Sequence, residues 1–472
     1  MINIKFGILF FFSIYSVMAT DKLTLPKLYS DKMVLQREQA IPVYGWTDSG
    51  LEVTVDFNKQ SKRVIAATNG FWKVEFPAMP AGGPFTMQIT DGKTRRVIQD
   101  VMIGDVWLCS GQSNMVFQLR RTSNLKSALA DCDYPGLRLF NVWKNWQLKP
   151  AKKLKNGLWL PSDQKRIGNF SAVAWSFGRE LHKKLRVPIG LITSAWSGSS
   201  IDTWMSLQTL QSKPEFEKIA ARAKKNLENN MADVKKPYFQ PTVLFNGMIN
   251  PLPPFPVRGM IWYQGEANRG DGMLYADKME AMLNNLRTLW EKPDLPFYFV
   301  QIAPYKYTWG KPETLPEIWA AQNAFIRRVP HTGMAVINDL GDLKDIHPKD
   351  KIPVGQRLAA QALNKTYGMK DVKCDSPEFA GLRIDGNQMI IEFKHAEGLK
   401  TRDAKAPDWF EICGTDGKYY PANAKISGNK VLLSSTKAGQ PVGVRFAWDM
   451  TAQPNLINAA NLPAGAFRSS SK

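Results

Sequence analysis

The stretch best suited to nucleophilic chemistry surrounds Ser113. The apolar run Val106–Cys109 leads into Gly111-Gln112-Ser113-Asn114. A strand that runs into a glycine-containing turn presents the next side chain at the carboxyl edge of a sheet, where an attacking hydroxyl is accessible. Ser113 is therefore a candidate nucleophile. Serine and asparagine also cap helices, so a structural role for Ser113 and Asn114 is an equally good alternative on this evidence alone.

A serine nucleophile needs a neighbouring base, and the chain has only four histidines. His182 lies beside two lysines in an expected helix, and His395 lies in a late strand-rich region. His331 precedes an expected strand, at the amino edge, which is the wrong edge for catalysis. His347 follows that strand on the loop 339–348. Elimination and position make His347 the candidate base, and a surface histidine without a role is the alternative.

A carboxylate close to His347 would orient the imidazole and stabilise its charged form. Asp345 lies two positions before His347, and Asp342 lies five positions before it. We favour Asp345. One alternative is that Asp342 orients His347, and another is that a backbone carbonyl does so. Both aspartates could also be ordinary surface residues without a role in the site.

Acyl transfer also needs hydrogen-bond donors where the carbonyl oxygen becomes negative. Gly198, after the run Leu191–Ala195, would let the backbone approach closely and offer its N–H. Gln264, after Ile261-Trp262-Tyr263, could donate through its side chain. The alternatives are that Gly198 is only a turn glycine and that the Gln264 amide is only structural. Glu266 is expected to brace the loops at the substrate site rather than to act as a base.

Parallel strands must bring these segments together. Near-continuous apolar strands alternate with amphipathic helices in the middle third of the chain, which predicts an α/β domain with a parallel sheet covered on both faces. The expected strands are 106–109, 189–193, 257–263, 297–302 and 334–337, and the expected helices are 175–185, 274–290, 316–328 and 354–367.

Short alternating strands separated by turn residues occupy both flanks of this region. They predict β-rich, sandwich-like modules. The expected divisions are a β-rich domain over 20–103, the α/β domain over 104–370 and a β-rich region over 371–472. The aromatic residues near the candidate site could stack on sugar rings, but most of them are expected to fill the core. They are Trp196, Trp204, Trp262 and Tyr263.

The N-terminus has the pattern of a signal peptide over residues 1–19. Lys5 precedes an apolar block, and Val17-Met18-Ala19 suits a signal peptidase. The apolar run is shorter than the ~20 residues that span a bilayer, which disfavours the alternative of a membrane anchor. The sequence therefore predicts an exported protein, periplasmic or secreted, without a stable membrane span in its mature form.

Charge and cysteine content indicate which classes of partner and cofactor to expect. The formal charge is +20, but the lysines and arginines are spread along the chain without a nucleic-acid fingerprint, so no nucleic-acid partner is expected. The four cysteines lack metal-site spacing, and no metal or other cofactor is expected. The spacing of the cysteines does not indicate whether they form disulfides or remain free thiols.

Several blocks together resemble the sialate O-acetylesterase family, a branch of the SGNH/GDSL hydrolases. The similar blocks are Gly111-Gln112-Ser113-Asn114-Met115, Trp262-Tyr263-Gln264-Gly265-Glu266 and Asp345-Ile346-His347-Pro348. Two flanking blocks, 30–37 and 461–468, extend the resemblance over nearly the whole mature chain.

The resemblance implies an SGNH-like three-layer α/β/α domain and a carbohydrate O-acetylesterase. It implies Ser113 as nucleophile, His347 as base, and an oxyanion hole formed by the Ser113 amide, Gly198 and Gln264. The expected substrate is an O-acetylated sialic acid, and acetylated xylan or another glycan is the alternative. An exported glycan-binding protein without activity is a further alternative. The sequence does not indicate which hydroxyl is acetylated or the oligomeric state.

Overall fold

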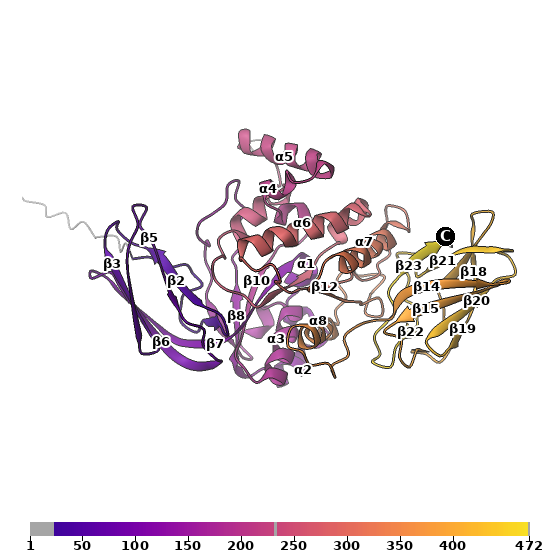
Figure 1. Cartoon of the computed structure of the whole chain (residues 1–472), viewed down its shortest axis with the longest axis horizontal. Helices are drawn as coiled ribbons and strands as arrows, with labels where there is room; N and C mark the ends of the chain where they lie inside the picture. Colours follow the sequence, from indigo (N-terminus) through magenta and orange to yellow (C-terminus); the bar gives the residue numbers. More distant parts are fainter. Residues whose placement is uncertain (1–22, 231–233, 471–472) are drawn as a thin grey trace, which may run out of the picture.

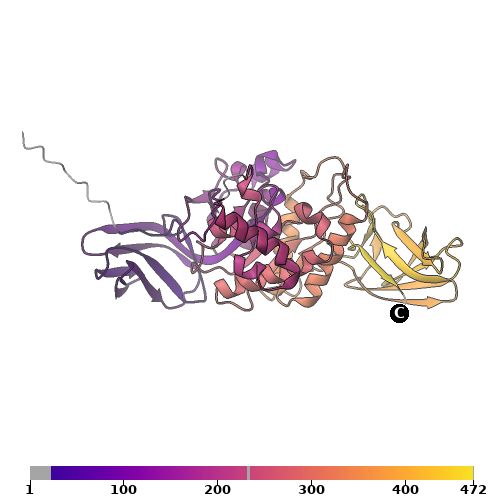
Figure 2. The same cartoon turned by 90° about the horizontal axis from the view of Figure 1, so that it is seen from above.

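The computed structural model describes residues 23–230 and 234–470, which form three parts arranged along one axis (Figures 1 and 2). A β-rich part begins the chain, an α/β part lies in the middle, and a second β-rich part ends it. This architecture confirms the expected fold class. The expected signal peptide, residues 1–19, lies outside the described residues.

The middle part is built on one sheet with the strand order β13-β12-β11-β7-β10-β8-β9. All neighbours are parallel except β8 and β9. The bounds are β7 (Arg95–Gly111), β8 (Tyr134–Asn141), β9 (Trp159–Ser162), β10 (Ile189–Ala195), β11 (Gly259–Tyr263), β12 (Phe297–Val300) and β13 (Thr332–Ala335).

Two of these strands were not expected from the sequence. Pro135 and Gly136 occupy the start of β8, so only a short apolar run remains to indicate a strand. The four residues of β9 include Pro161, which an edge strand tolerates because one side has no ladder partner. Both strands extend the sheet beyond β10, away from β13.

Helices cover both faces of this sheet, as expected. On one face α3 (Ala172–Leu185) packs against α8 (Ile352–Lys365), and on the other α6 (Leu274–Leu289) packs against α7 (Thr314–Arg328) (Figure 1). Shorter helices lie in the connections: α1 (Ser113–Val116), α2 (Leu125–Ala130), α4 (Leu207–Leu210) and α5 (Glu217–Glu228).

The N-terminal β-rich part shares a strand with the middle part. The first half of β7 pairs with β1 and β6, and its second half is the central strand of the parallel sheet. The expected division at 103/104 therefore falls inside one continuous strand. The remaining strands here are β1 (Val34–Gln36), β2 (Ile41–Trp46), β3 (Glu52–Phe57), β4 (Gln60–Ile65), β5 (Phe71–Phe76) and β6 (Gly82–Thr90).

The C-terminal β-rich part contains two four-stranded sheets and a two-stranded ladder. One sheet has the order β14-β15-β20-β19, and the other has the order β18-β17-β21-β23. The bounds are β14 (Glu378–Asp385), β15 (Gln388–Lys394), β16 (Lys400–Thr401), β17 (Phe410–Gly414), β18 (Tyr419–Pro421), β19 (Asn423–Ser427), β20 (Lys430–Ser434), β21 (Pro441–Phe446), β22 (Leu456–Ile457) and β23 (Phe467–Ser470).

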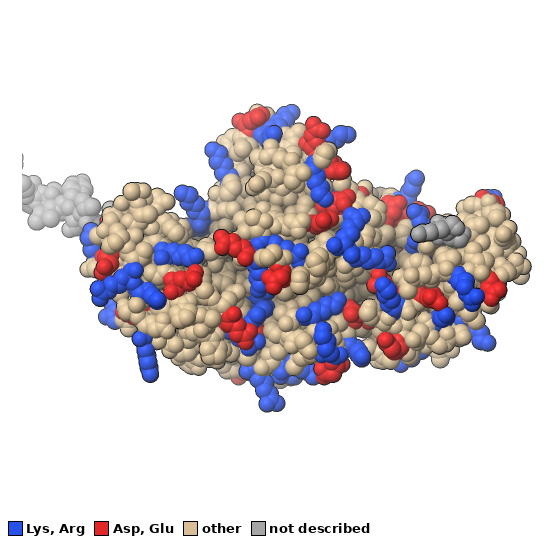
Figure 3. Space-filling view, in the orientation of Figure 1, with Lys and Arg blue, Asp and Glu red and all other residues tan. Residues whose placement is uncertain are grey.

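The four cysteines, Cys109, Cys132, Cys374 and Cys413, are buried free thiols. Across 23–230 and 234–470, no helix has the length and apolar character needed to cross a bilayer. Lysine and arginine side chains are interspersed with aspartate and glutamate over the face of the molecule shown in Figure 3. This pattern agrees with charges that are spread along the sequence.

Candidate active site

The structure brings Ser113 and His347 together although 234 positions separate them. Ser113 begins the short helix α1, directly beyond the carboxyl end of β7, and His347 lies on the loop beyond β13. Their side chains meet with Ser113 Oγ 2.8 Å from His347 Nε2. This distance is that of a hydrogen bond, so the pair can pass a proton directly.

Glycine at position 111 allows the sharp turn before Ser113. Its φ is 138°, and a Cβ atom there would lie 2.2 Å from the carbonyl oxygen of Tyr263. The Gln112 amide donates to the same Tyr263 carbonyl at 2.9 Å, and the Trp196 amide donates to the Gly111 carbonyl at 3.1 Å. The ends of β7, β10 and β11 are thereby tied together around the serine.

Asp345 lies beside the imidazole without a short contact to it. One carboxylate oxygen, Oδ1, accepts a hydrogen bond from the His347 backbone amide at 2.9 Å and lies 3.7 Å from His347 Nδ1. The Asp345 side chain is 41% exposed. Asp342 instead accepts a hydrogen bond from the Lys344 amide. Of the two aspartates weighed from the sequence, Asp345 is the one placed next to the base.

The surroundings of His347 favour its neutral form. Burial lowers the pKa of His347 below its usual value, the cations Lys351 and Arg121 lower it further, and Asp345 raises it. The Phe117 ring stacks on the imidazole at 6.0 Å between centroids, and the Arg121 guanidinium lies 4.7 Å above the Phe117 ring centroid. A neutral imidazole can accept the proton of a serine hydroxyl.

Gln264 has its polar side-chain atoms engaged within the protein. Its side chain is fully buried, Nε2 donates to Gln112, Ser199 and Asn268 at 3.1, 3.2 and 2.6 Å, and Oε1 accepts from Tyr275 at 2.7 Å. These contacts use both amide hydrogens. They favour the structural alternative over the expected donation to an oxyanion, because donation would break buried hydrogen bonds.

Gly198 lies on an exposed turn close to Ser113. The residue is exposed on the turn after β10, with a φ of 72° in the left-handed region that suits glycine. Within the part of the chain that the structure describes, its N–H donates to no protein acceptor. The Phe239 ring would lie 3.2 Å from a Cβ atom at this position. A larger residue would therefore be both strained and crowded.

Asn114 and Lys351 are two further residues of the site. From the sequence, Asn114 is expected at most to cap a helix, and Lys351 has no expected role. The Asn114 carboxamide donates to Glu266 Oε1 at 2.6 Å and to the Ile346 carbonyl at 3.1 Å, and Lys351 Nζ donates to Asn114 Oδ1 at 2.7 Å. Glu266, expected as a brace between loops, is thus joined to the residue that follows Ser113. A lysine on a polar loop gives no sequence signal of burial.

The aromatic residues divide between core and surface. Trp204, Trp262 and Tyr263 are buried, as expected of core side chains, whereas Trp196 is half-buried and stacks on Tyr238 at 5.3 Å. The Lys144 ammonium lies 5.1 Å from the Trp196 ring centroid. Aromatic and cationic groups therefore flank the turn that carries Gly198. Across the described residues, no cluster of three or more His, Cys, Asp or Glu side chains could hold a metal ion.

The chain is similar to known carbohydrate esterases over most of its length. A family model described as "Carbohydrate esterase, sialic acid-specific acetylesterase" matches residues 103–364. The sialate O-acetylesterase of Mus musculus is 30% identical over 88% of this chain and 87% of its own length, and that of Homo sapiens is 28% identical over 89% and 86%. The crystal structure of a carbohydrate acetylesterase from Xanthomonas citri is 36% identical, with a TM-score of 0.87 over 95% of this chain and 99% of that one.

Proposed function

Because this chain belongs to the family of carbohydrate esterases described as sialic acid-specific acetylesterases, we propose that it removes O-acetyl groups from sialic acids by serine chemistry. The observation that carries the mechanism is the 2.8 Å contact between Ser113 Oγ and His347 Nε2. An isolated serine hydroxyl is a weak nucleophile at neutral pH, and a base at this distance activates it.

The reaction proceeds in two acyl-transfer steps. His347 Nε2 takes the Ser113 proton as Oγ bonds to the acetyl carbonyl carbon. The imidazolium then gives that proton to the sugar oxygen, which leaves as the C–O bond of the ester breaks. His347 next takes a proton from water as the water oxygen attacks the acetyl-serine. The bond between the acetyl carbon and Ser113 Oγ then breaks, the proton on His347 returns to Oγ, and acetic acid departs and ionises to acetate in water.

Backbone amides are the candidate donors for the oxyanion. The Ser113 amide is at the first residue of α1, where an N–H has no partner within the helix, and the Gly198 amide lies on the adjacent turn. Two fixed N–H groups directed at the developing charge stabilise the transition state more than the ester. Gln264 then serves to hold the Gln112 and Asn268 side chains in place.

Asp345→Asn is expected to lower kcat/KM by about fivefold or less, because an exposed carboxylate near a charged partner is worth about 1 kcal/mol or less. Asp345 also raises the pKa of His347, so its loss should move the acidic limb of the pH–rate profile to lower pH. Hydrolysis of p-nitrophenyl acetate from pH 4 to 8 measures both effects, with Asp342→Asn as matched control. A loss beyond a thousandfold would contradict this weak role.

An acidic sugar is the substrate class that the site favours. Arg121 is exposed, and its guanidinium lies above the Phe117 ring that stacks on His347. Among the described residues, no carboxylate forms an ion pair with it. A sialic acid brings a carboxylate that such a cation can pair with. The direct experiment compares acetate release from O-acetylated sialic acid and from acetylated xylan. Faster turnover of acetylated xylan would favour the alternative substrate.

Arg121→Gln is expected to raise KM for O-acetylated sialic acid about tenfold to a hundredfold, the value of one charge-assisted hydrogen bond. KM for the uncharged p-nitrophenyl acetate should stay unchanged at a pH where His347 is fully neutral. Arg120→Gln is the matched control, because Arg120 is the neighbouring exposed arginine and contacts Gln118 instead. Equal changes for the charged and the uncharged ester would contradict recognition of the carboxylate by Arg121.

The proposed site of action is outside the cytoplasm, periplasmic or secreted, on the pattern of residues 1–19. N-terminal sequencing of the protein recovered from its host tests this, with Thr20 expected as the first residue. An inactive glycan-binding protein is the competing function. Absence of turnover on every acetyl ester, together with failure of a serine-reactive inhibitor to label Ser113, would favour it.

A further inference from the structure

We propose that Lys351 is a positioning residue of the esterase: through Asn114 it holds the Ser113 turn against the His347 loop, and it places a positive charge on the Phe117 ring that stacks on His347. The inference rests on the proposed function. It assigns a role to a cation that the acyl-transfer steps themselves do not use.

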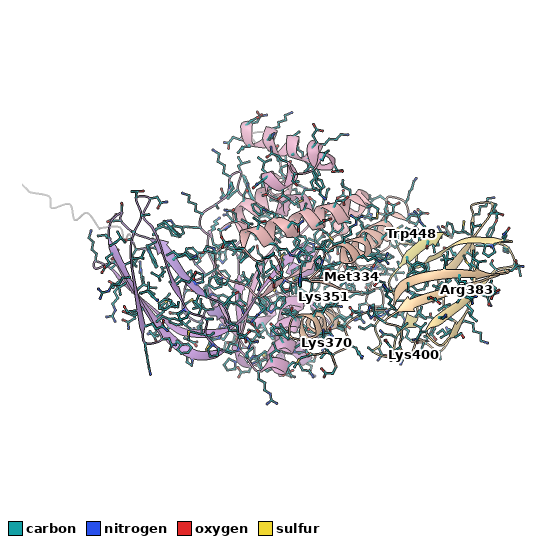
Figure 4. The ribbon with its side chains drawn as sticks, in the orientation of Figure 1. Met334, Lys351, Lys370, Arg383, Lys400 and Trp448 are labelled. Atoms are coloured by element: carbon teal, nitrogen blue, oxygen red, sulfur yellow. The ribbon has the colours of Figure 1, made fainter. Side chains whose placement is uncertain are left out.

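Lys351 is a buried cation at the centre of the molecule. Its exposed fraction is 1%, it immediately precedes α8, and Figure 4 shows it in the middle part, far from both β-rich ends. Among the described residues, it has no carboxylate within 4 Å of its ammonium group. Burial of an ammonium group without an adjacent counterion costs free energy of folding. Buried titratable groups of this kind are typical of functional sites.

Asn114 connects Lys351 to the turn that carries Ser113 and to the loop that carries His347. Lys351 Nζ donates to Asn114 Oδ1 at 2.7 Å, and Asn114 Nδ2 donates to Glu266 Oε1 at 2.6 Å and to the Ile346 carbonyl at 3.1 Å. Asn114 directly follows the nucleophile, and Ile346 directly precedes the base. One carboxamide therefore fixes the register between the two loops that must exchange a proton.

The charge of Lys351 acts on His347 over a longer distance. Burial lowers the pKa of Lys351 to about 7, so the ammonium form predominates in the more acidic range where His347 titrates. A neighbouring cation disfavours a second positive charge on the imidazole. Asp345 opposes this effect at His347, whereas Arg121 adds to it. The groups that raise the pKa of Lys351 are Glu266, Asp345 and Asp350, and the Tyr263 and Phe117 rings lie 5.6 and 5.2 Å from its ammonium.

The first test measures the pKa of His347 directly. Because the chain has only four histidines, the imidazole protons of the protein labelled in histidine can be followed by NMR, with His347→Gln identifying the resonance. In Lys351→Met we expect the pKa of His347 to rise by ~0.5 pH unit or more. Lys349→Met is the matched control, since Lys349 is exposed on the same loop, and it should leave the pKa of His347 unchanged.

The second test follows catalysis. In Lys351→Met the acidic limb of kcat/KM for p-nitrophenyl acetate should move to higher pH, and kcat at the plateau should fall about tenfold or more because Asn114 loses its donor. Lys351→Gln retains a donor group without the charge, so it should show the pKa shift with a smaller loss of kcat. This contrast separates the effect of charge from that of the hydrogen bond.

The outcomes distinguish this inference from the proposed function. An inactive wild-type protein would refute the esterase, whereas the NMR titration would still measure the effect of Lys351 on His347. The same pKa of His347 in wild type and in both Lys351 variants, or an equal rise in Lys349→Met, would overturn the inference. If neither variant at Lys351 folds, a wild-type His347 that titrates at or above its ordinary value would overturn it as well.

Discussion

Ser113→Ala is expected to abolish hydrolysis of acetyl esters, with kcat/KM reduced by about four orders of magnitude or more. The hydroxyl oxygen is the atom that bonds to the acetyl carbon, and among the described residues no other hydroxyl lies within hydrogen-bond distance of His347 Nε2. The folded state should be preserved, because the side chain is half-buried and the substitution removes a single oxygen. Initial rates with p-nitrophenyl acetate and a thermal melt measure the two effects.

Ser123→Ala is the matched control for this loss. Ser123 is an exposed serine on the loop beyond α1, where its backbone amide, not its hydroxyl, contacts the Lys349 carbonyl. Its activity should equal that of the wild type. A serine-reactive inhibitor should label wild type and Ser123→Ala but not Ser113→Ala. Turnover by Ser113→Ala close to that of the wild type would remove Ser113 from the mechanism.

The parts of the fold that were predictable follow from simple periodicity. The second half of β7 and the strands β10, β11 and β12 are mainly apolar and buried, whereas the first half of β7 is partly exposed. The long helices that cover this sheet are amphipathic. Strand β8 was missed because its first residues resemble a turn, and pairing with β10 decides its conformation. The sequence also does not indicate that β7 continues through two parts of the molecule, because Gly104 in the middle of the strand resembles a turn between domains.

Glycine at position 104 illustrates why local sequence is insufficient there. A Cβ atom at Gly104 would lie 2.0 Å from the Pro188 carbonyl, so the glycine permits a close approach of two backbones within a strand. From the sequence, the same glycine is typical of a turn between domains. The contact that explains it comes from a segment more than eighty residues away.

The reactive pair was predictable because reactive residue types are rare and their location is restricted. Four histidines and the rule that functional groups follow the carboxyl ends of parallel strands left His347 as the candidate, and the structure places it against Ser113. The roles of the residues that support this pair could not be predicted in the same way. The hydrogen bonds of Gln264 come from several segments, and the burial of Lys351 depends on how α8 packs.

His347→Gln carries the second largest expected effect, a loss of about three orders of magnitude or more in kcat/KM. Glutamine can accept a hydrogen bond from Ser113 but does not take up its proton at neutral pH, so the hydroxyl stays a weak nucleophile. The pH dependence should change as well. In the wild type kcat/KM should rise through the pKa of His347, which burial and nearby cations hold below its usual value, and then level off. The residual rate of the variant should instead rise with hydroxide and show no such plateau.

His331→Asn separates this loss from a general effect of removing an imidazole. His331 is exposed at the amino edge of the sheet, and its φ of 59° suits asparagine. Its pH–rate profile should coincide with that of the wild type. If His347→Gln kept both the rate and the acidic limb, the limb would belong to another group, and the 2.8 Å contact with Ser113 would have no part in activating the serine. If the limb disappears only in His347→Gln, the proton that leaves Ser113 passes to that imidazole.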